Sequence, residues 1–415
     1  MTIIEYLGMD RYFVAFEDSA EPGAAALAGG AEDGPRDAGK EPLDKGAQKE
    51  TSGVRVTNAG ASAADCGQFF ELLPMIMQGY KTAFEIGQSA GVSAVFRYGA
   101  TSREHGAMMR AVLPKIFASS TPDFYICGGA SIFRGVHNSM NCFQVCRGAW
   151  AAMPAMPTER RLSAAAVIGS KLYVAGGEKE DPLARQYRQL RDFECFDSFA
   201  GQWQGLQAMP TARAGCAGAA ASGMVYVFGG RTDDTVGAAA ERFDPAPGRW
   251  ERVPDLPTAR SGCAAAAMAG MMYVLGGKDG NGQVLTMAEC FDPRLGWWQV
   301  LPPMPTPRSA CACSAVNSLL LVAGGFNGLE GTADVHAWDP ALGSWQAQAP
   351  MQTWRVGAAA AGIGGKLYVL GGKTGVDSLM GECFDPDEGE AGSWRWLPST
   401  PARHVYCVGG AVVGR

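Results

Sequence analysis

The chain has 415 residues, of which 47% are hydrophobic and 18% charged, with a formal net charge of -6 and a pI near 5.4. This length and hydrophobic content allow a large folded core, and the slightly acidic balance excludes general affinity for nucleic acid or anionic membranes. No run of about 18 apolar residues occurs, and the N-terminus carries acids without a basic stretch. Neither a membrane span nor a secretory signal is therefore expected.

The first part of the chain divides into two stretches of different composition. Small residues, glycine, proline and charged residues dominate residues 17 to 65. Such a composition cannot bury enough apolar surface to offset its ordering entropy, so residues 1–65 are predicted to be largely disordered. Residues 66–121 have apolar residues at roughly helical spacing, and Thr101 to Glu104 fits a capping box, which predicts a short helical segment.

The cysteines indicate the cellular compartment. Twelve cysteines are present, no CxxC pair occurs, and Cys142 with Cys146 has no second pair at zinc-site distance. Unpaired thiols are typical of a reducing environment. We therefore expect a cytoplasmic protein, with the nucleus as the second candidate compartment.

From residue 122 onward, a short apolar segment that ends in two glycines recurs six times. The segments read FYICGG, KLYVAGG, VYVFGG, MYVLGG, LLVAGG and LYVLGG, and their first glycines stand at 128, 176, 229, 276, 324 and 371. The resulting steps of 48, 53, 47, 48 and 47 residues indicate a stacked supersecondary unit.

Three further marks follow each glycine pair in a fixed order. The first is an aromatic residue, followed by Asp in five of the six units: Phe143, Phe196, Phe243, Phe291, Trp338 and Phe384. The second is a tryptophan: Trp150, Trp203, Trp250, Trp298, Trp345 and Trp394. The third is an arginine after a proline-rich turn: Arg160, Arg213, Arg260, Arg308, Arg355 and Arg403. A run of small residues comes after each of the first five arginines.

Each unit reads as four short strands, and six units predict an all-β, six-bladed β-propeller over residues 122–415. Small residues suit the strands that converge on the axis, and the aromatic rings suit the wider gaps between blades. The first unit lacks an arginine-led inner strand upstream, whereas a spare one, ARHVYCVGGAVV, ends the chain. The C-terminal strand is therefore expected to complete the first blade and to remove the exposed edges of an open ring.

The ordered set of a glycine pair, an aromatic before Asp and a tryptophan about seven residues later resembles the kelch repeat. The resemblance covers residues 122–415, and kelch propellers commonly close through a terminal strand. The family's usual tyrosine is phenylalanine in five units and tryptophan in one, which preserves ring volume. No BTB domain is recognisable before residue 122.

The residues that carry chemistry are dispersed among the repeats. The four histidines, His105, His137, His336 and His404, fall in different units. No pair has metal-ligand spacing, so neither an enzyme nor a cofactor nor a metal is expected. His336 takes a strand position that holds glutamate in other units and is expected on the surface.

Cysteines and arginines also recur at fixed repeat positions. Cys216, Cys263 and Cys311 each stand three residues after a repeat arginine and are expected to be small buried fillers; a thiol cluster for a metal is the alternative. The repeat arginines are expected to tie neighbouring blades together; anion binding is the alternative.

Resemblance to kelch substrate receptors implies that two positions per blade line one mouth of the ring. The residues after the glycine pairs are Ala130, Glu178, Arg231, Lys278, Phe326 and Lys373. The residues after the repeat arginines are Arg161, Ala214, Ser261, Ser309, Val356 and His404. The expected partner-binding residues are Arg161, Glu178, Arg231, Ser261, Lys278, Ser309, Phe326, Lys373 and His404. Because basic residues outnumber acidic ones among them, the expected ligand is an acidic peptide motif, with Phe326 as an apolar contact. The alternative is that these are ordinary solvated charges on loops.

The resemblance implies a non-enzymatic module that binds a partner protein or peptide. One form of this function is substrate recognition for a ubiquitin ligase; without a BTB domain, direct binding to a cullin is not expected. An actin-binding or scaffold kelch protein is a second form. A kelch-like enzyme, such as a sugar isomerase or a metal oxidase, is the alternative class and needs polar catalytic groups at the axis.

Overall fold

The computed structural model describes residues 3–4, 12–16, 54–58, 121–131, 135–181, 183–184, 186–232, 235–375, 379–389 and 391–413. Two units, Met1–Ser120 and Thr121–Arg415, divide the chain. The first unit contains one antiparallel sheet in the order β1-β2-β3, formed by β1 (Ile3–Ile4), β2 (Tyr12–Phe16) and β3 (Val54–Asn58). Apart from these strands, the disorder predicted for 1–65 and the helices predicted for 66–121 lie outside the described residues.

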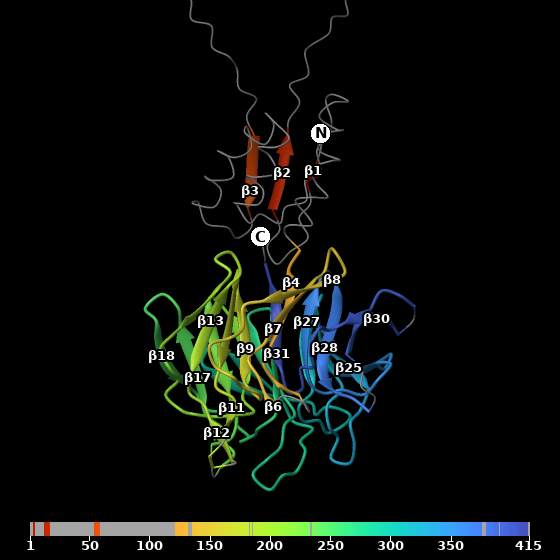
Figure 1. Ribbon diagram of the computed structural model, residues 1–415. Helices are drawn as coiled ribbons and strands as arrows, with labels where there is room; N and C mark the ends of the chain where they lie inside the picture. Colours follow the sequence, from red (N-terminus) through yellow and green to blue (C-terminus); the bar gives the residue numbers. More distant parts are fainter. Residues whose placement is uncertain are drawn as a thin grey trace, which may run out of the picture. The chain divides into compact units, whose positions relative to one another are not determined.

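The second unit is a six-bladed β-propeller of four-stranded antiparallel sheets (Figure 1), which confirms the predicted fold. Blade 1 consists of β4 (Asp123–Cys127), β7 (Met140–Gln144), β8 (Ala149–Met153) and β31 (Val408–Val412). Blade 2 consists of β9 (Ala164–Ile168), β10 (Lys171–Ala175), β13 (Phe193–Asp197) and β14 (Gln202–Gly205). Blade 3 consists of β15 (Ala217–Ala221), β16 (Met224–Phe228), β17 (Ala240–Asp244) and β18 (Arg249–Val253).

The remaining blades follow in chain order. Blade 4 consists of β19 (Ala264–Met268), β20 (Met271–Leu275), β21 (Ala288–Asp292) and β22 (Trp297–Leu301). Blade 5 consists of β23 (Ala312–Val316), β24 (Leu319–Ala323), β25 (Val335–Asp339) and β26 (Ser344–Gln348). Blade 6 consists of β27 (Val356–Ile363), β28 (Lys366–Lys373), β29 (Met380–Asp385) and β30 (Ser393–Ser399).

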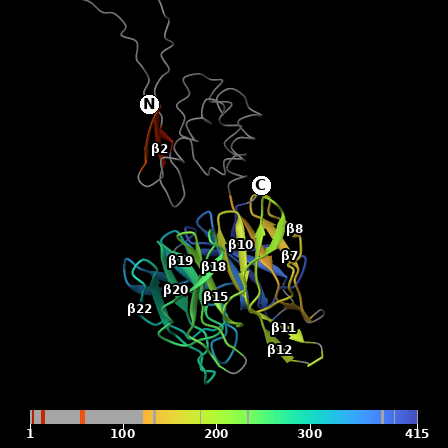
Figure 2. The ribbon, with the colours of Figure 1, turned by 90° about the vertical axis from the view of Figure 1, so that its left-hand side faces the viewer.

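Two short hairpins extend the first two blades beyond their glycine pairs. They are formed by β5 (Ala130–Ser131) with β6 (Gly135–Val136), and by β11 (Glu178–Asp181) with β12 (Gln186–Gln189). Figure 2 shows the β11–β12 hairpin standing out from the lower edge of the propeller. The β11–β12 hairpin therefore extends blade 2 beyond the edge of the propeller.

The ring is closed by the last strand of the chain, as predicted. β31 pairs antiparallel with β4 along its whole length, from Val408 opposite Cys127 to Val412 opposite Asp123. In Figure 1 the blue end of the chain lies beside the orange strands that begin the propeller. Blade 1 is thus assembled from both ends of the propeller sequence.

The core lies between the blades. In the described part of the chain, six clusters of buried apolar side chains each join two neighbouring blades, and the cluster between blades 6 and 1 joins Phe124 and Phe143 with Tyr368 and Leu370. In every blade the repeat aromatic lies opposite the repeat tryptophan, with ring centroids 5.0 to 5.4 Å apart. Burial of these paired rings supplies the favourable packing that the repeat pattern predicts.

Each repeat tryptophan also reaches back to the preceding blade. Its indole N–H donates to a backbone oxygen there at 2.7 to 2.9 Å, as Trp203 does to Pro154 and Trp150 does to Pro398. The bond from Trp150 spans the closure between blades 1 and 6. The tryptophans therefore fix the blades to one another as well as filling the gaps.

The repeat arginines reach forward, which confirms their predicted role as ties between blades. Arg260 is completely buried, and its Nη1 donates to the carbonyls of Gly276 and Met287 in blade 4, at 3.2 Å each. Its Nη2 lies 2.8 Å from the carboxylate of Glu289, outside good hydrogen-bond geometry but within ion-pair distance. Its own backbone carbonyl accepts from Gly230 of blade 3. Each such arginine connects the blade before it, through its backbone carbonyl, to the blade after it, through its side chain.

The arginine ties have two variations. Arg308 meets His336 in place of a glutamate, with Nη2 2.7 Å from Nδ1 of the histidine. The expectation that His336 lies on the surface was wrong, because the imidazole is half-buried as the partner of this arginine. Burial and the charge of Arg308 lower the pKa of His336, which favours the neutral ring that can accept this bond.

The sixth tie is His404, so the repeat position assigned to Arg403 was wrong by one residue. The backbone carbonyl of His404 accepts from Gly372, as the arginine carbonyls do in the other blades. Its ring is 2% exposed, with Nδ1 2.8 Å from the carbonyl of Gly128 and Nε2 2.9 Å from the amide of Asn141. His404 therefore fastens the closing seam and does not line the mouth.

Stability is expected to depend on the protonation of His404. Desolvation, and then the neighbouring ring of His137, lower its pKa from the ordinary 6.5 to about 4, although the bond to Gly128 opposes this. As the pH falls, the unfolded chain takes up the proton first, so stability that is fully present above pH 6.5 is lost between pH 6.5 and 4. The slope of unfolding free energy against pH reports how many more protons the unfolded chain binds than the folded one. In His404→Gln, this difference should decrease by about one proton within the window. An unchanged slope, measured by urea unfolding, would contradict this assignment.

The glycine pairs let the backbones of neighbouring segments approach closely. Gly277 has φ +101°, and a Cβ there would lie 2.9 Å from the carbonyl oxygen of Ser261. We expect Gly277→Ala to cost about 2–3 kcal/mol, because strain and a backbone clash combine. Gly270→Ala is the matched control, since Gly270 has φ +77° and open space around its Cβ position. Equal losses for the two variants in chemical denaturation would show that close approach contributes nothing.

Candidate functional site

The structure pairs the two repeat positions that were predicted to line the mouth. In blade after blade, the residue following the repeat arginine forms a backbone bridge with the residue following the glycine pair. The bridges are Arg161 with Glu178, Ala214 with Arg231, Ser261 with Lys278, Ser309 with Phe326, and Val356 with Lys373. At the closing blade the bridge joins Ala130 to Val405, which takes the place that His404 was expected to hold.

A cavity of about 490 Å³ opens at this mouth. Six of the nine predicted binding residues line it: Arg231, Ser261, Lys278, Ser309, Phe326 and Lys373. They come from blades 3 to 6, and the lining is completed by Leu162, Gly215, Gly262, Ala310, Gly331, Trp354, Val356 and Tyr406. Most of the predicted set is therefore brought together in one cavity.

Glu178 forms a buried charge network at the edge of this cavity. Its carboxylate is completely buried and accepts from Arg161 at 2.9 Å and from Arg231 of the next blade. The guanidinium of Arg161 also lies over the ring of Tyr187, 3.9 Å from its centroid. Arg161 and Arg231 are thus tied to the protein's own carboxylate, and their charge is partly neutralised within the mouth.

The two lysines of the cavity are placed differently. Lys278 lies over the ring of Phe326, with Nζ 4.8 Å from the centroid. Lys373 is exposed at the end of β28, where its backbone pairs with Val356. Neither lysine is ion-paired to a carboxylate in the described part of the chain, so these two ammonium groups carry the positive charge available to a ligand.

The cavity floor is a ring of backbone hydrogen bonds around the axis. The ring contains one residue from each blade connection, two positions after the tie residue: Leu162, Gly215, Gly262, Ala310, Gly357 and Tyr406. All six have φ between +50° and +71°. Five N–H groups donate to the preceding carbonyl of the ring at 2.7 to 3.1 Å, including Leu162 to Tyr406 across the closing seam.

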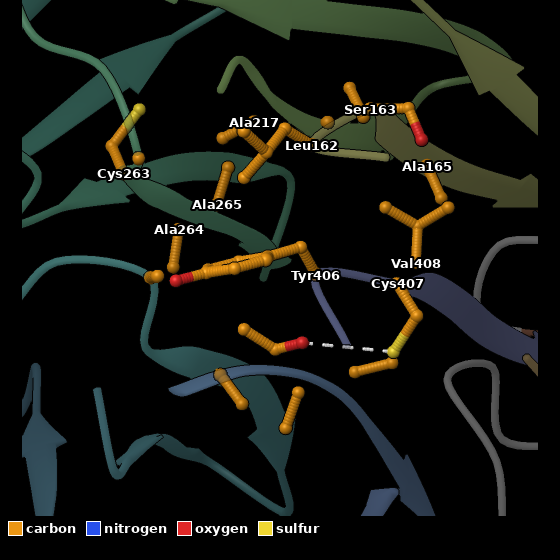
Figure 3. Close-up of a pocket in the computed structure, with 18 of the residues that line it drawn as sticks. Leu162, Ser163, Ala165, Ala217, Cys263, Ala264, Ala265, Tyr406, Cys407 and Val408 are labelled. Atoms are coloured by element: carbon orange, nitrogen blue, oxygen red, sulfur yellow. Dashed lines mark hydrogen bonds between the residues drawn. The ribbon is translucent and has the colours of Figure 1, made fainter. Parts of the chain in front are cut away.

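Below this floor lies a smaller axial cavity of about 140 Å³, lined mainly by alanine, glycine and cysteine. Figure 3 shows Tyr406 reaching across it, from the side of Cys407 toward that of Ala264 and Cys263. Tyr406 is one of five residues that line both cavities, with Leu162, Gly215, Gly262 and Ala310, so it lies at the boundary between the mouth and the axis.

The axial cysteines pack into the blades, as expected of small buried fillers. Cys216, Cys263 and Cys311 are at most 9% exposed, and burial raises the pKa of Cys263 to about 12 and that of Cys311 to about 11. The Sγ of Cys216 lies toward the carbonyl of Arg213, at 3.9 Å. Such thiols stay protonated at neutral pH.

The described part of the chain offers no cluster of metal ligands. No group of three His, Cys, Asp or Glu side chains there is arranged to hold a metal ion. No helix among the same residues has the length and hydropathy needed to cross a bilayer.

Sequence reasoning missed two aromatic residues of the mouth, Trp354 and Tyr406. Trp354 immediately precedes a repeat arginine, where the preceding units have Glu159, Ala212, Ala259 and Pro307. This break in the repeat was the signal that could have identified it. Tyr406 was hidden by the one-residue error in the last unit.

These repeats, ties and mouth loops define a class of protein, the kelch-type β-propeller. A model of the KLHDC2/KLHL20/DRC7 Kelch-repeats domain matches residues 116–325, and a model of the Kelch motif matches residues 307–352. The chain belongs to the kelch-repeat family.

Individual relatives match only part of the chain. Kelch-like protein 25 of Xenopus tropicalis is 33% identical over 103 residues, which cover 25% of this chain and 16% of that protein. Kelch-like protein 25 of Homo sapiens is 29% identical over 106 residues, covering 26% of this chain and 17% of that protein. A solved structure titled "Structure of YjhT" has a TM-score of 0.56 at 17% identity, covering 66% of this chain and 97% of its own. That likeness concerns the fold alone.

Proposed function

We propose that this protein is a non-enzymatic interaction module that holds an acidic segment of a partner protein in the mouth cavity. The observation that carries the proposal is the cavity of about 490 Å³ in which Lys278 and Lys373 have no carboxylate partner among the described residues and share the lining with Ser261 and Ser309. Ammonium and hydroxyl groups are suitable donors to Asp and Glu carboxylates. Membership of the kelch-repeat family supports the same assignment.

Reversal of the mouth charges tests this proposal. In Lys278→Glu/Lys373→Glu, association with an acidic partner should slow and most of its salt dependence should disappear, because both free ammonium groups become carboxylates. The matched control is Arg191→Glu/Arg252→Glu. It changes net charge equally, at two exposed side chains that lie outside the cavity lining and have no ion pair in the described part of the chain.

The measurement is affinity purification of tagged full-length chains from cell lysate, followed by mass spectrometry and by binding assays at two ionic strengths. Partners should be lost from the mouth variant and kept by the control. An unchanged partner set on a folded mouth variant would contradict the proposal. Arg231 is left intact, because a glutamate at this position would face the buried carboxylate of Glu178.

Two specific forms of this function differ in what accompanies the partner. A substrate-recognition subunit of a ubiquitin ligase should co-purify with other ligase subunits, whereas an actin-binding or scaffold protein should co-sediment with filaments. We place either activity in the cytoplasm or nucleus, which imaging of the tagged chain tests. An enzymatic role is not favoured, since the axial cavity of the described residues is lined mainly by alanine, glycine and cysteine.

A further inference from the structure

The mouth cavity has a second chemical character besides its charge. Three aromatic rings line it together with Lys278 and Lys373: Phe326 from blade 5, Trp354 from the connection to blade 6, and Tyr406 from the closing connection. A carboxylate alone would need only the lysines and hydroxyls. The rings offer an apolar surface that an acidic side chain cannot use.

The loops around Trp354 leave room for its indole. A Cβ at Gly331 of blade 5 would overlap the indole ring, and one at Gly375 of blade 6 would lie 2.7 Å from its Nε1. Trp354 is half-buried between these two loops while the same side chain lines the cavity. The indole is therefore held in place before any ligand arrives, which reduces the entropy lost on binding.

One residue of the cavity floor, Tyr406, is also aromatic. Tyr406 adopts φ +55°, and its ring packs against the backbone of Gly357, where a Cβ would overlap it. Because Tyr406 lines both the mouth cavity and the axial cavity, a ligand side chain that reaches this part of the floor meets its ring. Aromatic side chains in concave sites commonly anchor a bulky apolar residue of the partner.

We propose that the mouth recognises a bulky apolar or aromatic side chain of its partner, adjacent to the acidic residue. This inference rests on the proposed function and deepens it. Lys278 and Lys373 bind the acid, and Trp354 with Tyr406 forms the seat for the apolar anchor. Cations with aromatic rings also suit single-stranded nucleic acid. The chain's net charge of -6 and the exposed Glu330 on the mouth loop favour the protein segment.

The test uses immobilised full-length protein and a random dodecamer peptide library displayed on phage. The parent should enrich peptides in which Asp or Glu lies within a few positions of Trp, Phe, Leu or Met. A synthetic peptide of the enriched sequence should bind about tenfold more weakly to Trp354→Ala, the loss typical of a removed anchor contact. Trp354→Leu should restore part of this loss, because it keeps apolar bulk.

Two controls separate the seat from general effects. Trp396→Ala removes an exposed tryptophan from β30 of the same blade, outside the cavity, and should bind as the parent does. Thermal melting of each variant shows that the propeller is intact. A folded Trp354→Ala that binds the peptide unchanged would overturn the inference.

The remaining outcomes distinguish the two proposals. Enrichment of acidic peptides without a bulky apolar residue would overturn the proposed apolar-anchor site at Trp354 and Tyr406 and would leave the proposed function standing. Enrichment of peptides that lack Asp and Glu, and that bind Lys278→Glu/Lys373→Glu as tightly as the parent, would overturn the proposed function and the inference with it. Salt-sensitive binding of a fluorescent dT dodecamer at the mouth, with no peptide enriched above a bare surface, would overturn both.

Discussion

Removal of residues 404–415 is expected to abolish the folded propeller or to lower its melting temperature by about 10 °C or more. The deletion takes away β31, so β4 loses its inner neighbour, and the buried side chains of Cys407 and Val412 are lost with it. It also removes His404, the tie between blades 6 and 1, and the ring residue Tyr406. Three independent connections across the seam are lost together.

Differential scanning calorimetry of the deletion variant checks this expectation, with soluble yield as a second readout. Removal of residues 414 and 415 alone is the control, since β31 ends at Val412. A truncated chain that melts with the full-length protein would show that the seam contributes little.

Arg260→Ala is expected to lower the free energy of unfolding by about 3–5 kcal/mol. The variant leaves the carboxylate of Glu289, which is completely buried, without its cation. Burial already raises the pKa of Glu289, so the orphaned carboxyl is costly in its charged form. Equilibrium unfolding in urea at pH 7 measures the loss, and Glu289→Gln in the same background should recover part of it.

Arg308→Ala is the matched control for this effect. Arg308 also donates to two backbone carbonyls, those of Gly324 and Asp334, but its side-chain partner His336 is favoured in its neutral form. Its loss therefore orphans no buried carboxylate and should cost clearly less. If the two substitutions cost the same, the backbone bonds, and not the ion pair, hold the blades.

The fold was predictable because each repeat mark answers a local packing requirement. The glycine pairs, the aromatic before Asp and the tryptophan recur because every blade must meet its neighbours in the same way. The ring closure followed from a count of inner strands, and β31 pairs as that count required. Repetition thus made a long-range contact readable from the sequence.

The site was less predictable because it depends on what breaks the repeat. The misassigned tie at Arg403 could have been avoided, since Cys407 stands three residues after His404, as Cys216 does after Arg213. The pairing of Arg231 with Glu178 could not be foreseen, because charges from different blades meet only in the folded ring. A list of charges at loop positions does not show which are already neutralised.

The opposite directions of the tryptophan and arginine ties have a consequence for how the molecule comes apart. Each blade bonds to the preceding blade through its own tryptophan, and the arginine or histidine that follows it bonds to the next blade. Closure by β31 leaves no end blade. Open repeat arrays can lose their terminal repeats first. Here no blade can fray alone, so amide protons near the axis of all six blades should exchange with solvent through one common opening event.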